Sequence, residues 1–290
     1  MRVLVTGGAG FIGSHVVNYL IEHNYDVIVM DNFSTGSVDN LPKKLEPIVI
    51  HTIGSDDPLP VGLKFDALIH LGAPVSVDES FMDPVKYFDQ IAYGTNELMK
   101  WAVTCGCENF VLASTAAVYG GNNNLPLDED AKLYPESPYA TSKLLMEYMA
   151  EAFKDQSVAI LRFFNVYGEG QRDEGGYLSA IPIFLNQYKN NEALTVTGDG
   201  KQTRDFIYVG DLVEAIEKSI SFNGVLNIGS GKEVSVIDLA LMFNKPGIGN
   251  IKFIPERKEL KRSLADIYNA YFWISWKPKT SLKEWIKSKL

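Results

Sequence analysis

A tyrosine and a lysine stand four residues apart in the segment Tyr139-Ala140-Thr141-Ser142-Lys143, which follows Pro138. Residues at this spacing share one face of a helix, so the pattern places a phenol beside an ammonium group. A nearby cation lowers the pKa of a tyrosine from about 10 towards neutrality, as a general base requires. The pattern alone also fits an ordinary surface pair. Thr115 favours the catalytic interpretation, because it ends a predicted strand where it could bond the same substrate hydroxyl.

A second motif lies at the start of the chain, in Thr6-Gly7-Gly8-Ala9-Gly10-Phe11-Ile12-Gly13. Glycines at positions 7, 10 and 13 let the backbone turn tightly, approach a pyrophosphate and pack a helix against a strand. The spacing is Gly-x-x-Gly-x-x-Gly, and a glycine loop by itself could also be a structural turn. Its place between a predicted strand and a predicted helix indicates a dinucleotide site.

Asp31 ends the second predicted strand, and Asn32 follows it. A carboxylate about twenty residues past a glycine loop can accept hydrogen bonds from ribose hydroxyls and would repel a 2′-phosphate. The sequence has no arginine near this strand end, so it favours NAD over NADP as cofactor. The alternative is that Asp31 only caps a turn.

These residues need a scaffold, and the chain alternates short β-branched runs with helix-length segments. Predicted strands cover residues 2–6, 26–31, 47–52, 66–71, 109–115 and 158–164, and predicted helices cover residues 11–23, 83–105 and 137–154. This order predicts βαβ units and an α/β fold of the Rossmann type, with a doubly wound parallel sheet. The carboxyl ends of the strands then share one edge, where the two motifs can meet.

After Gly168 the alternation of predicted strands and helices becomes less regular. A polar loop at 170–176, a helix at 178–188 and a short strand at 194–197 are expected there, with further buried strands at 206–209 and 225–228. We therefore expect an NAD-binding Rossmann domain over residues 1–168, with return segments near 204–238. A smaller α+β substrate-binding domain should cover residues 169–290.

Composition limits the classes of partner. The 290 residues fit two domains at ~150 residues each, and 46% hydrophobic residues suit a folded chain. A net charge of −9 disfavours general binding to nucleic acid or anionic membranes. Cys105 and Cys107 are too few for a disulfide framework or a zinc site, so no metal is expected. Without a signal peptide or an apolar run of ~20 residues, a cytoplasmic protein is expected.

Taken together, the motifs resemble those of the NAD-dependent epimerase/dehydratase family of extended short-chain dehydrogenases/reductases. The resemblance spans nearly the whole chain and rests on residues 6–13, Asp31-Asn32, His70-Leu71-Gly72-Ala73, Ser114–Gly120, 139–143, 162–168, 198–211, 227–231 and 276–282. Members of this family act on nucleotide-activated sugars.

The resemblance also implies roles for single residues. Those implied to hold NAD are Gly7, Gly10, Phe11, Ile12, Gly13, Asp31, Asn32, Leu71, Gly72, Ala73, Tyr139, Lys143 and Phe164. Those implied to contact the nucleotide sugar are Thr115, Asn165, Arg204, Arg257 and Ser263. The two arginines would grip the diphosphate, although surface salt bridges are the alternative for both. Thr115, Tyr139 and Lys143 form the implied catalytic set.

The residues after Thr115 bear on the reaction. Related dehydratases and decarboxylases carry acidic residues there, whereas this chain has Ala116 and Ala117. Epimerisation at C4 needs no second carboxyl group. The resemblance therefore implies interconversion of UDP-glucose and UDP-galactose, with the N-acetylated sugars as further substrates because Ser263 is small. The alternatives are a nucleotide-sugar reductase, a uronic-acid epimerase, or a catalytically silent NAD-binding protein.

Some positions depart from the family pattern. Ile91 replaces an asparagine, and residues 51–54 replace an acidic residue expected near the adenine. The resemblance also implies a homodimer that pairs the helices at 83–105 and 137–154. Apolar residues on these helices could form that interface, although packing within one subunit would explain many of them: Phe88, Ile91, Leu98, Met99, Leu144, Leu145 and Met149.

Overall fold

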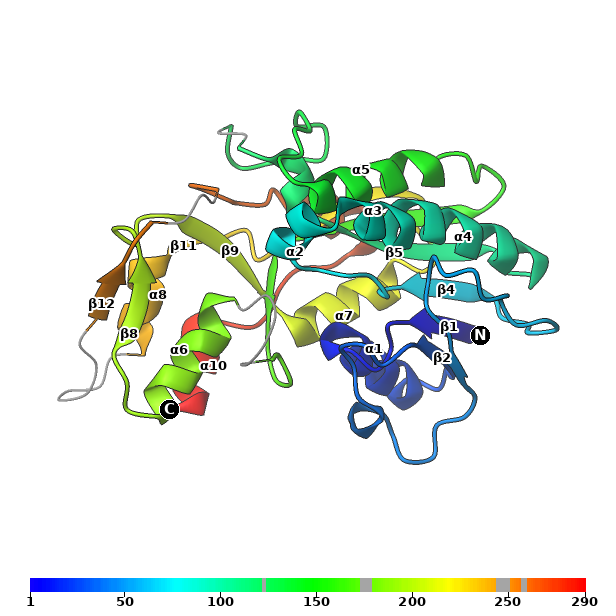
Figure 1. Cartoon of the computed structure of the whole chain (residues 1–290), viewed down its shortest axis with the longest axis horizontal. Coiled ribbons are helices and arrows are strands. Elements are labelled where there is room, and N and C mark those ends of the chain that lie inside the picture. The colour runs from blue at the N-terminus through cyan, green and yellow to red at the C-terminus, as the bar shows by residue number, and fades with distance from the viewer. Residues whose placement is uncertain (122–123, 173–178, 244–250, 257–259) are drawn as a thin grey trace.

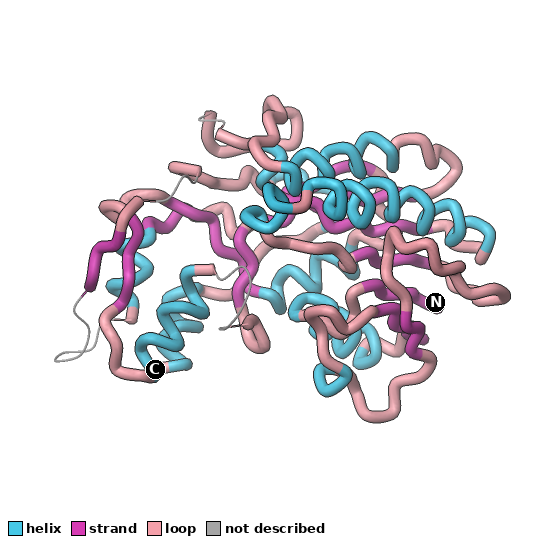
Figure 2. Tube along the Cα trace, in the orientation of Figure 1, coloured by secondary structure: helices cyan, strands magenta, loops and turns pink. Residues whose placement is uncertain are grey.

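The computed structural model describes residues 1–121, 124–172, 179–243, 251–256 and 260–290. Figure 1 shows a large α/β part that contains the N-terminus and a smaller part that contains the C-terminus. Figure 2 shows that the larger part is a sheet covered by helices on both faces. The predicted α/β fold of the Rossmann type is therefore confirmed.

The large sheet has seven parallel strands in the order β10-β6-β5-β4-β1-β2-β3. These strands are β1 (Arg2–Thr6), β2 (Asp26–Asp31), β3 (Ile48–Ile50), β4 (Ala67–His70), β5 (Asn109–Thr115), β6 (Ser157–Phe163) and β10 (Gly224–Ile228). Their interior residues are almost all apolar and buried, as expected for parallel strands covered on both faces. The order reverses between β1 and β4, which is where such sheets bind ligands.

Helices α1 (Phe11–Glu22), α7 (Val209–Lys218) and α9 (Tyr268–Ile274) pack on one face of the sheet. On the other face lie α4 (Gly94–Thr104), α5 (Pro138–Ala150) and a π-helix, η2 (Phe88–Tyr93). Two shorter helices, α2 (Val77–Met82) and α3 (Pro84–Tyr87), precede η2. Short 3₁₀ turns lie at η1 (Val38–Asn40) and η3 (Ala116–Tyr119).

The helix predicted over residues 83–105 is present as one uninterrupted helical run from Pro84 to Thr104, made of α3, the π-helical segment η2 and α4. The π-helical segment ends at a close backbone approach between two glycines. A Cβ atom at Gly94 would lie 2.7 Å from the amide nitrogen of Gly54, in the loop after β3. The apolar face expected there is also mostly internal, since Ile91, Leu98 and Met99 are buried in the core and only Phe88 is exposed.

The smaller part contains two small sheets. One has the order β11-β9-β7, with β7 (Asn165–Tyr167), β9 (Thr203–Tyr208) and β11 (Glu233–Ser235), and the other pairs β8 (Leu194–Thr197) with β12 (Ile251–Ile254). Helices α6 (Ala180–Lys189), α8 (Val236–Met242) and α10 (Leu282–Lys289) complete the core. The strand expected at 206–209 thus lies in a small sheet, whereas that at 225–228 joins the large one. In the described ranges, no helix combines the length and apolar character needed to cross a membrane.

Candidate active site

The glycine loop joins β1 to α1 and lies against the segment that follows β4. Gly7 has a φ of +66°, and a Cβ atom there would lie 2.7 Å from the amide nitrogen of Gly72. A Cβ atom at Gly13 would lie 2.0 Å from the carbonyl oxygen of Gly7. Side chains at these two positions would therefore open the loop. Gly10 is less constrained, with the nearest atom at 3.2 Å.

The N-terminus of α1 is open to an anion. Gly10 is its N-cap residue, and within the described chain no side chain caps this end and its first turn carries no acidic residue. The first-turn amides at Phe11 and Ile12 and the positive end of the helix dipole suit a pyrophosphate. The residues present therefore fit a dinucleotide.

Asp31 is buried and supports the glycine loop. Its carboxylate accepts hydrogen bonds from the amides of Ala9, at 2.9 Å, and Phe33, at 2.8 Å. Each oxygen keeps a second lone pair, so the turn-capping role and the ribose role are compatible. Asn32 is exposed, where its carbonyl oxygen accepts from the amide of Ser34 and its amide donates to the Thr52 hydroxyl.

Tyr139 and Lys143 lie in the first half of α5, which begins with Ser137 as N-cap and Pro138 in the first turn. The Lys143 side chain is buried, and its ammonium group donates to the carbonyl oxygen of Ala113 at 2.6 Å. Burial lowers the pKa of Lys143 to about 8. The Tyr139 ring packs edge-on against Tyr87, with 6.3 Å between centroids.

Thr115 ends β5 and caps the 3₁₀ turn η3, because its hydroxyl oxygen accepts the amide of Ala117 at 3.1 Å. The contact between Lys143 and Ala113 places α5 beside the last residues of this strand. Thr115, Tyr139 and Lys143 therefore all belong to the junction between α5 and the carboxyl end of β5. A phenol beside a buried cation at this edge can exchange a proton with a bound hydroxyl.

A buried ion pair that sequence reasoning missed supports this junction. The Glu147 carboxylate accepts from Arg162, with 2.7 Å between Oε2 and Nη2, and from the Ser114 hydroxyl. Both charged side chains are about 4% exposed. Arg162 also donates to the hydroxyl of Tyr119 at 2.9 Å. An arginine inside an otherwise apolar strand was the available signal, since a buried guanidinium needs an acidic partner.

Of the described residues expected to contact the sugar nucleotide, Asn165 and Arg204 lie on β7 and β9 of one small sheet. Phe164 is buried between β6 and β7, and Asn165 donates its side-chain amide to the carbonyl oxygen of Asp205 at 3.1 Å. Arg204 is half-buried in β9, and Ser263 is buried. Arg257 lies outside the described residues.

Asp205 was also missed by sequence reasoning. Its buried carboxylate accepts the amides of Ser230, Gly231 and Ala265 at 2.6, 2.9 and 3.1 Å. These bonds join β9 to the turn after β10 and to the segment that carries Ser263. Asp205 thereby holds the Arg204 and Ser263 segments in one place.

The sequence profile of the NAD dependent epimerase/dehydratase family matches residues 3–229. The chain belongs to this family. The resemblance inferred from the motifs is thereby confirmed, and the family's dependence on NAD agrees with the cofactor prediction.

Two solved epimerases are similar to this family member over almost its whole length. A UDP-N-acetylglucosamine 4-epimerase from Methanobrevibacter ruminantium, in complex with UDP-N-acetylmuramic acid, is 34% identical with a TM-score of 0.90 and covers 100% of this chain and 99% of its own. A UDP-glucose 4-epimerase from Thermotoga maritima with UDP-glucose is 32% identical with a TM-score of 0.91, covering 99% and 96%.

Curated relatives within the family include more than one activity. A Methanocaldococcus jannaschii protein described as "Putative UDP-glucose 4-epimerase" is 39% identical over 98% of this chain and 96% of its own length. A UDP-glucuronic acid decarboxylase from Danio rerio is 31% identical over 98% of this chain and 70% of its own. Similar members of the family therefore include both an epimerase and a decarboxylase by their descriptions.

Proposed function

We propose that this chain is an NAD-dependent UDP-sugar 4-epimerase that interconverts UDP-glucose and UDP-galactose by transient oxidation at C4. The observation that carries the proposal is the pair Ala116 and Ala117, which form the start of η3 directly after Thr115. Two methyl groups stand where related decarboxylases and dehydratases have acidic residues. The chain thus keeps the proton-transfer groups needed at C4, while positions 116 and 117 carry no carboxyl group for elimination or decarboxylation.

Thr115, Tyr139 and Lys143 have different proposed roles in the reaction at C4. Tyr139, as phenolate, accepts the proton of the C4 hydroxyl and later returns it, while Thr115 bonds the same hydroxyl. Lys143 stabilises the phenolate by its charge and bonds the nicotinamide ribose. Bound NAD supplies reversible hydride acceptance at C4 and is not consumed overall. Rotation of the 4-keto sugar before the hydride returns would invert the centre.

Binding of the cofactor and substrate falls to the other expected residues. The glycine loop, the first turn of α1 and Asp31 hold the dinucleotide, with residues 71–73 and Phe164 on its nicotinamide side. Asn165, Arg204 and Arg257 bind the diphosphate of the substrate. We propose that Ser263 lines the sugar pocket and leaves room for an N-acetyl group, which the similarity to an N-acetylglucosamine epimerase supports.

The decisive experiment incubates the purified protein with UDP-, dTDP- and GDP-sugars and separates the C4 epimers, with bound cofactor identified in the same sample. Co-purified NAD and interconversion of UDP-glucose and UDP-galactose are expected. Release of carbon dioxide from UDP-glucuronic acid would contradict the proposal. So would net reduction that consumes added NADPH, or NAD that washes out freely during gel filtration.

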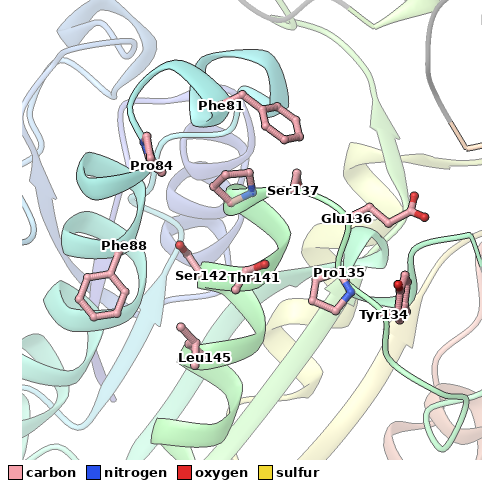
Figure 3. Close-up of a pocket in the computed structure, with 11 residues that line it drawn as sticks. Phe81, Pro84, Phe88, Tyr134, Pro135, Glu136, Ser137, Thr141, Ser142 and Leu145 are labelled. Atoms are coloured by element: carbon pink, nitrogen blue, oxygen red, sulfur yellow. The ribbon is translucent and has the colours of Figure 1, made fainter.

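We also propose that the protein is a homodimer that pairs the α2–α3 and α5 surfaces. Phe81, Met82, Val85 and Phe88 are exposed on this side, as are Leu145 and Tyr148 of α5. Three of them, Phe81, Phe88 and Leu145, line a pocket of about 660 Å³, as Figure 3 shows. On α5 the pocket is lined by Pro138, Thr141, Ser142 and Leu145, and Lys143 is not among its lining residues. Contiguous apolar surface of this kind commonly marks a protein interface.

Analytical ultracentrifugation tests the dimer. Phe88→Asp combined with Leu145→Glu should yield monomers, whereas Val61→Asp at a fully exposed position should not. A wild-type protein that sediments as a monomer at micromolar concentration would refute this part of the proposal.

A further inference from the structure

Three buried polar side chains form a line at the carboxyl edge of the large sheet. Thr6 ends β1, His70 ends β4, and Thr95 lies in the first turn of α4, and each is at most 1% exposed. The Thr6 hydroxyl lies 2.6 Å from Nδ1 of His70, and the Thr95 hydroxyl lies 2.9 Å from Nε2. None of these side chains has a role in the chemistry at C4.

The hydrogen bonds at Thr95 and Thr6 determine which atoms donate and which accept along this line of side chains. The Thr95 hydroxyl donates its single proton to the carbonyl oxygen of Ile91, so it must accept from Nε2–H of His70. The Thr6 hydroxyl oxygen accepts the amide of Gly72 at 3.2 Å and has its own proton free for Nδ1. The network therefore assigns a neutral, Nε2-protonated His70. Burial, with the charge of Lys143, lowers the pKa of His70 to about 3, which agrees with a neutral ring.

One end of the line reaches the cofactor loop. The segment after β4 touches the glycine loop so closely that a Cβ atom at Gly72 would lie 3.0 Å from the amide nitrogen of Gly7. The Thr6 hydroxyl binds the amide of this same Gly72. A shift of Thr6 would therefore move both the glycine loop and the Gly72 segment, which are expected to bind the dinucleotide.

The other end reaches the π-helix η2, through the carbonyl oxygen of Ile91. A Cβ atom at Gly54, in the loop after β3, would lie 2.3 Å from the carbonyl oxygen of Asp89 in the same helix. The π-helix therefore contacts the loop after β3 directly and the glycine loop through His70. Both loops lie at the carboxyl edge of the sheet, where dinucleotides bind.

We propose that His70 is a positioning residue for NAD: its neutral ring fastens the Thr6 hydroxyl, and thereby Gly72 and the glycine loop, to the π-helix η2. The role concerns binding of the cofactor and does not depend on which sugar the enzyme converts.

The test measures NAD affinity of NAD-free protein by calorimetry, without any sugar, alongside its unfolding temperature. His70→Leu removes both bonds, and Thr95→Val removes the far one. Both should weaken NAD binding at least tenfold, while Thr95→Ser stays within about threefold of wild type because it keeps the hydroxyl. Thr104→Val is the matched control on α4, since this exposed hydroxyl donates to the carbonyl oxygen of Trp101 within the same helix.

A purely structural role would lower the unfolding temperature and leave the NAD affinity of the folded fraction unchanged, and that result would overturn the proposal. If His70→Leu does not fold, the comparison of Thr95→Val with Thr95→Ser decides. Imidazole nitrogen shifts of wild-type protein give a second readout. They should report the Nε2–H tautomer from pH 5.5 to 8.5, and a ring that titrates in that range would also overturn the proposal.

Discussion

The ammonium group of Lys143 donates a hydrogen bond to the carbonyl oxygen of Ala113, two residues before β5 ends. One turn later on α5, Glu147 accepts from the hydroxyl of Ser114, the next residue of the strand. Helix and strand are thus fastened at consecutive strand positions, and Thr115 follows directly. This register fixes which side of α5 faces the strand end, so a rotation of the helix would break both bonds.

The buried charge on Lys143 makes stability depend on pH. The folded pKa is about 8, against 10.5 for an unperturbed lysine. Between these values the unfolded state binds more protons, so the free energy of unfolding rises with pH. NAD-free wild type should gain on the order of 2 kcal/mol relative to Lys143→Met between about pH 7.5 and pH 10 in urea titrations. Lys100→Met, at an exposed site on α4, should show no such trend relative to wild type.

Replacement of the phenol should stop turnover and spare binding. Tyr139→Phe removes the group that exchanges the C4 proton, and a loss on the order of 10³-fold in kcat is expected. NAD content after purification should match wild type. Tyr271→Phe is the control, because this tyrosine is exposed on α9, outside the proposed dimer surface. An epimerisation rate close to wild type in Tyr139→Phe would disprove the assigned role.

Removal of only one partner of the ion pair between Glu147 and Arg162 should lower the free energy of unfolding strongly. Glu147→Ala leaves a buried guanidinium without its carboxylate, which should cost about 3–5 kcal/mol in unfolding free energy. Glu97→Ala, which breaks an exposed pair with Lys100, should cost below about 1 kcal/mol. Chemical denaturation of both variants gives the comparison, and similar losses would contradict the prediction.

A methyl group in the glycine loop should impair the cofactor site. Gly13→Ala forces a Cβ atom to within 2.0 Å of the carbonyl oxygen of Gly7, so the loop must shift. NAD affinity should fall at least about tenfold, since the backbone can no longer approach the pyrophosphate. Gly121→Ala should bind NAD normally, because its added Cβ would be 3.5 Å from the Glu136 carboxylate.

Substrate range offers a test of the sugar pocket. If Ser263 lines it, Ser263→Tyr should lower kcat/KM for UDP-N-acetylglucosamine at least about tenfold more than for UDP-glucose. The non-acetylated sugar is the internal control for folding. Wild-type protein that turns over UDP-glucose and leaves UDP-N-acetylglucosamine untouched would remove the basis of this prediction.

Much of the large sheet could be predicted because its strands are continuous apolar runs. The strands at 2–6, 26–31 and 109–115 have the predicted ends, while the predicted strand at 47–52 shortens to Ile48–Ile50 at the sheet edge. Helical periodicity could not reveal the π-helix, because the glycine contact that accompanies it joins positions 54 and 94. Such a contact depends on the tertiary fold.

In the candidate site, too, residues within short sequence motifs could be predicted, whereas residues that act through tertiary contacts could not. Motifs indicated Tyr139, Lys143 and the glycine loop, each of which lies within one short segment. Asp205 and Glu147 act by joining distant segments, so their bonds to Ala265 and Arg162 could not be read from spacing. His70 was noted only as part of a motif, and its bonds to two threonines depend on the pairing of β1 with β4.

The position of β10 affects how the chain can be assembled. This strand pairs with β6 at one end of the large sheet, yet 60 residues separate Phe163 from Gly224. During synthesis, β6 must therefore stay as an edge without its β10 partner until β7, α6, β8, β9 and α7 have been made. Exposed parallel edges are prone to wrong pairing. A fragment that stops near residue 168 should consequently aggregate, and the two parts should depend on each other for folding.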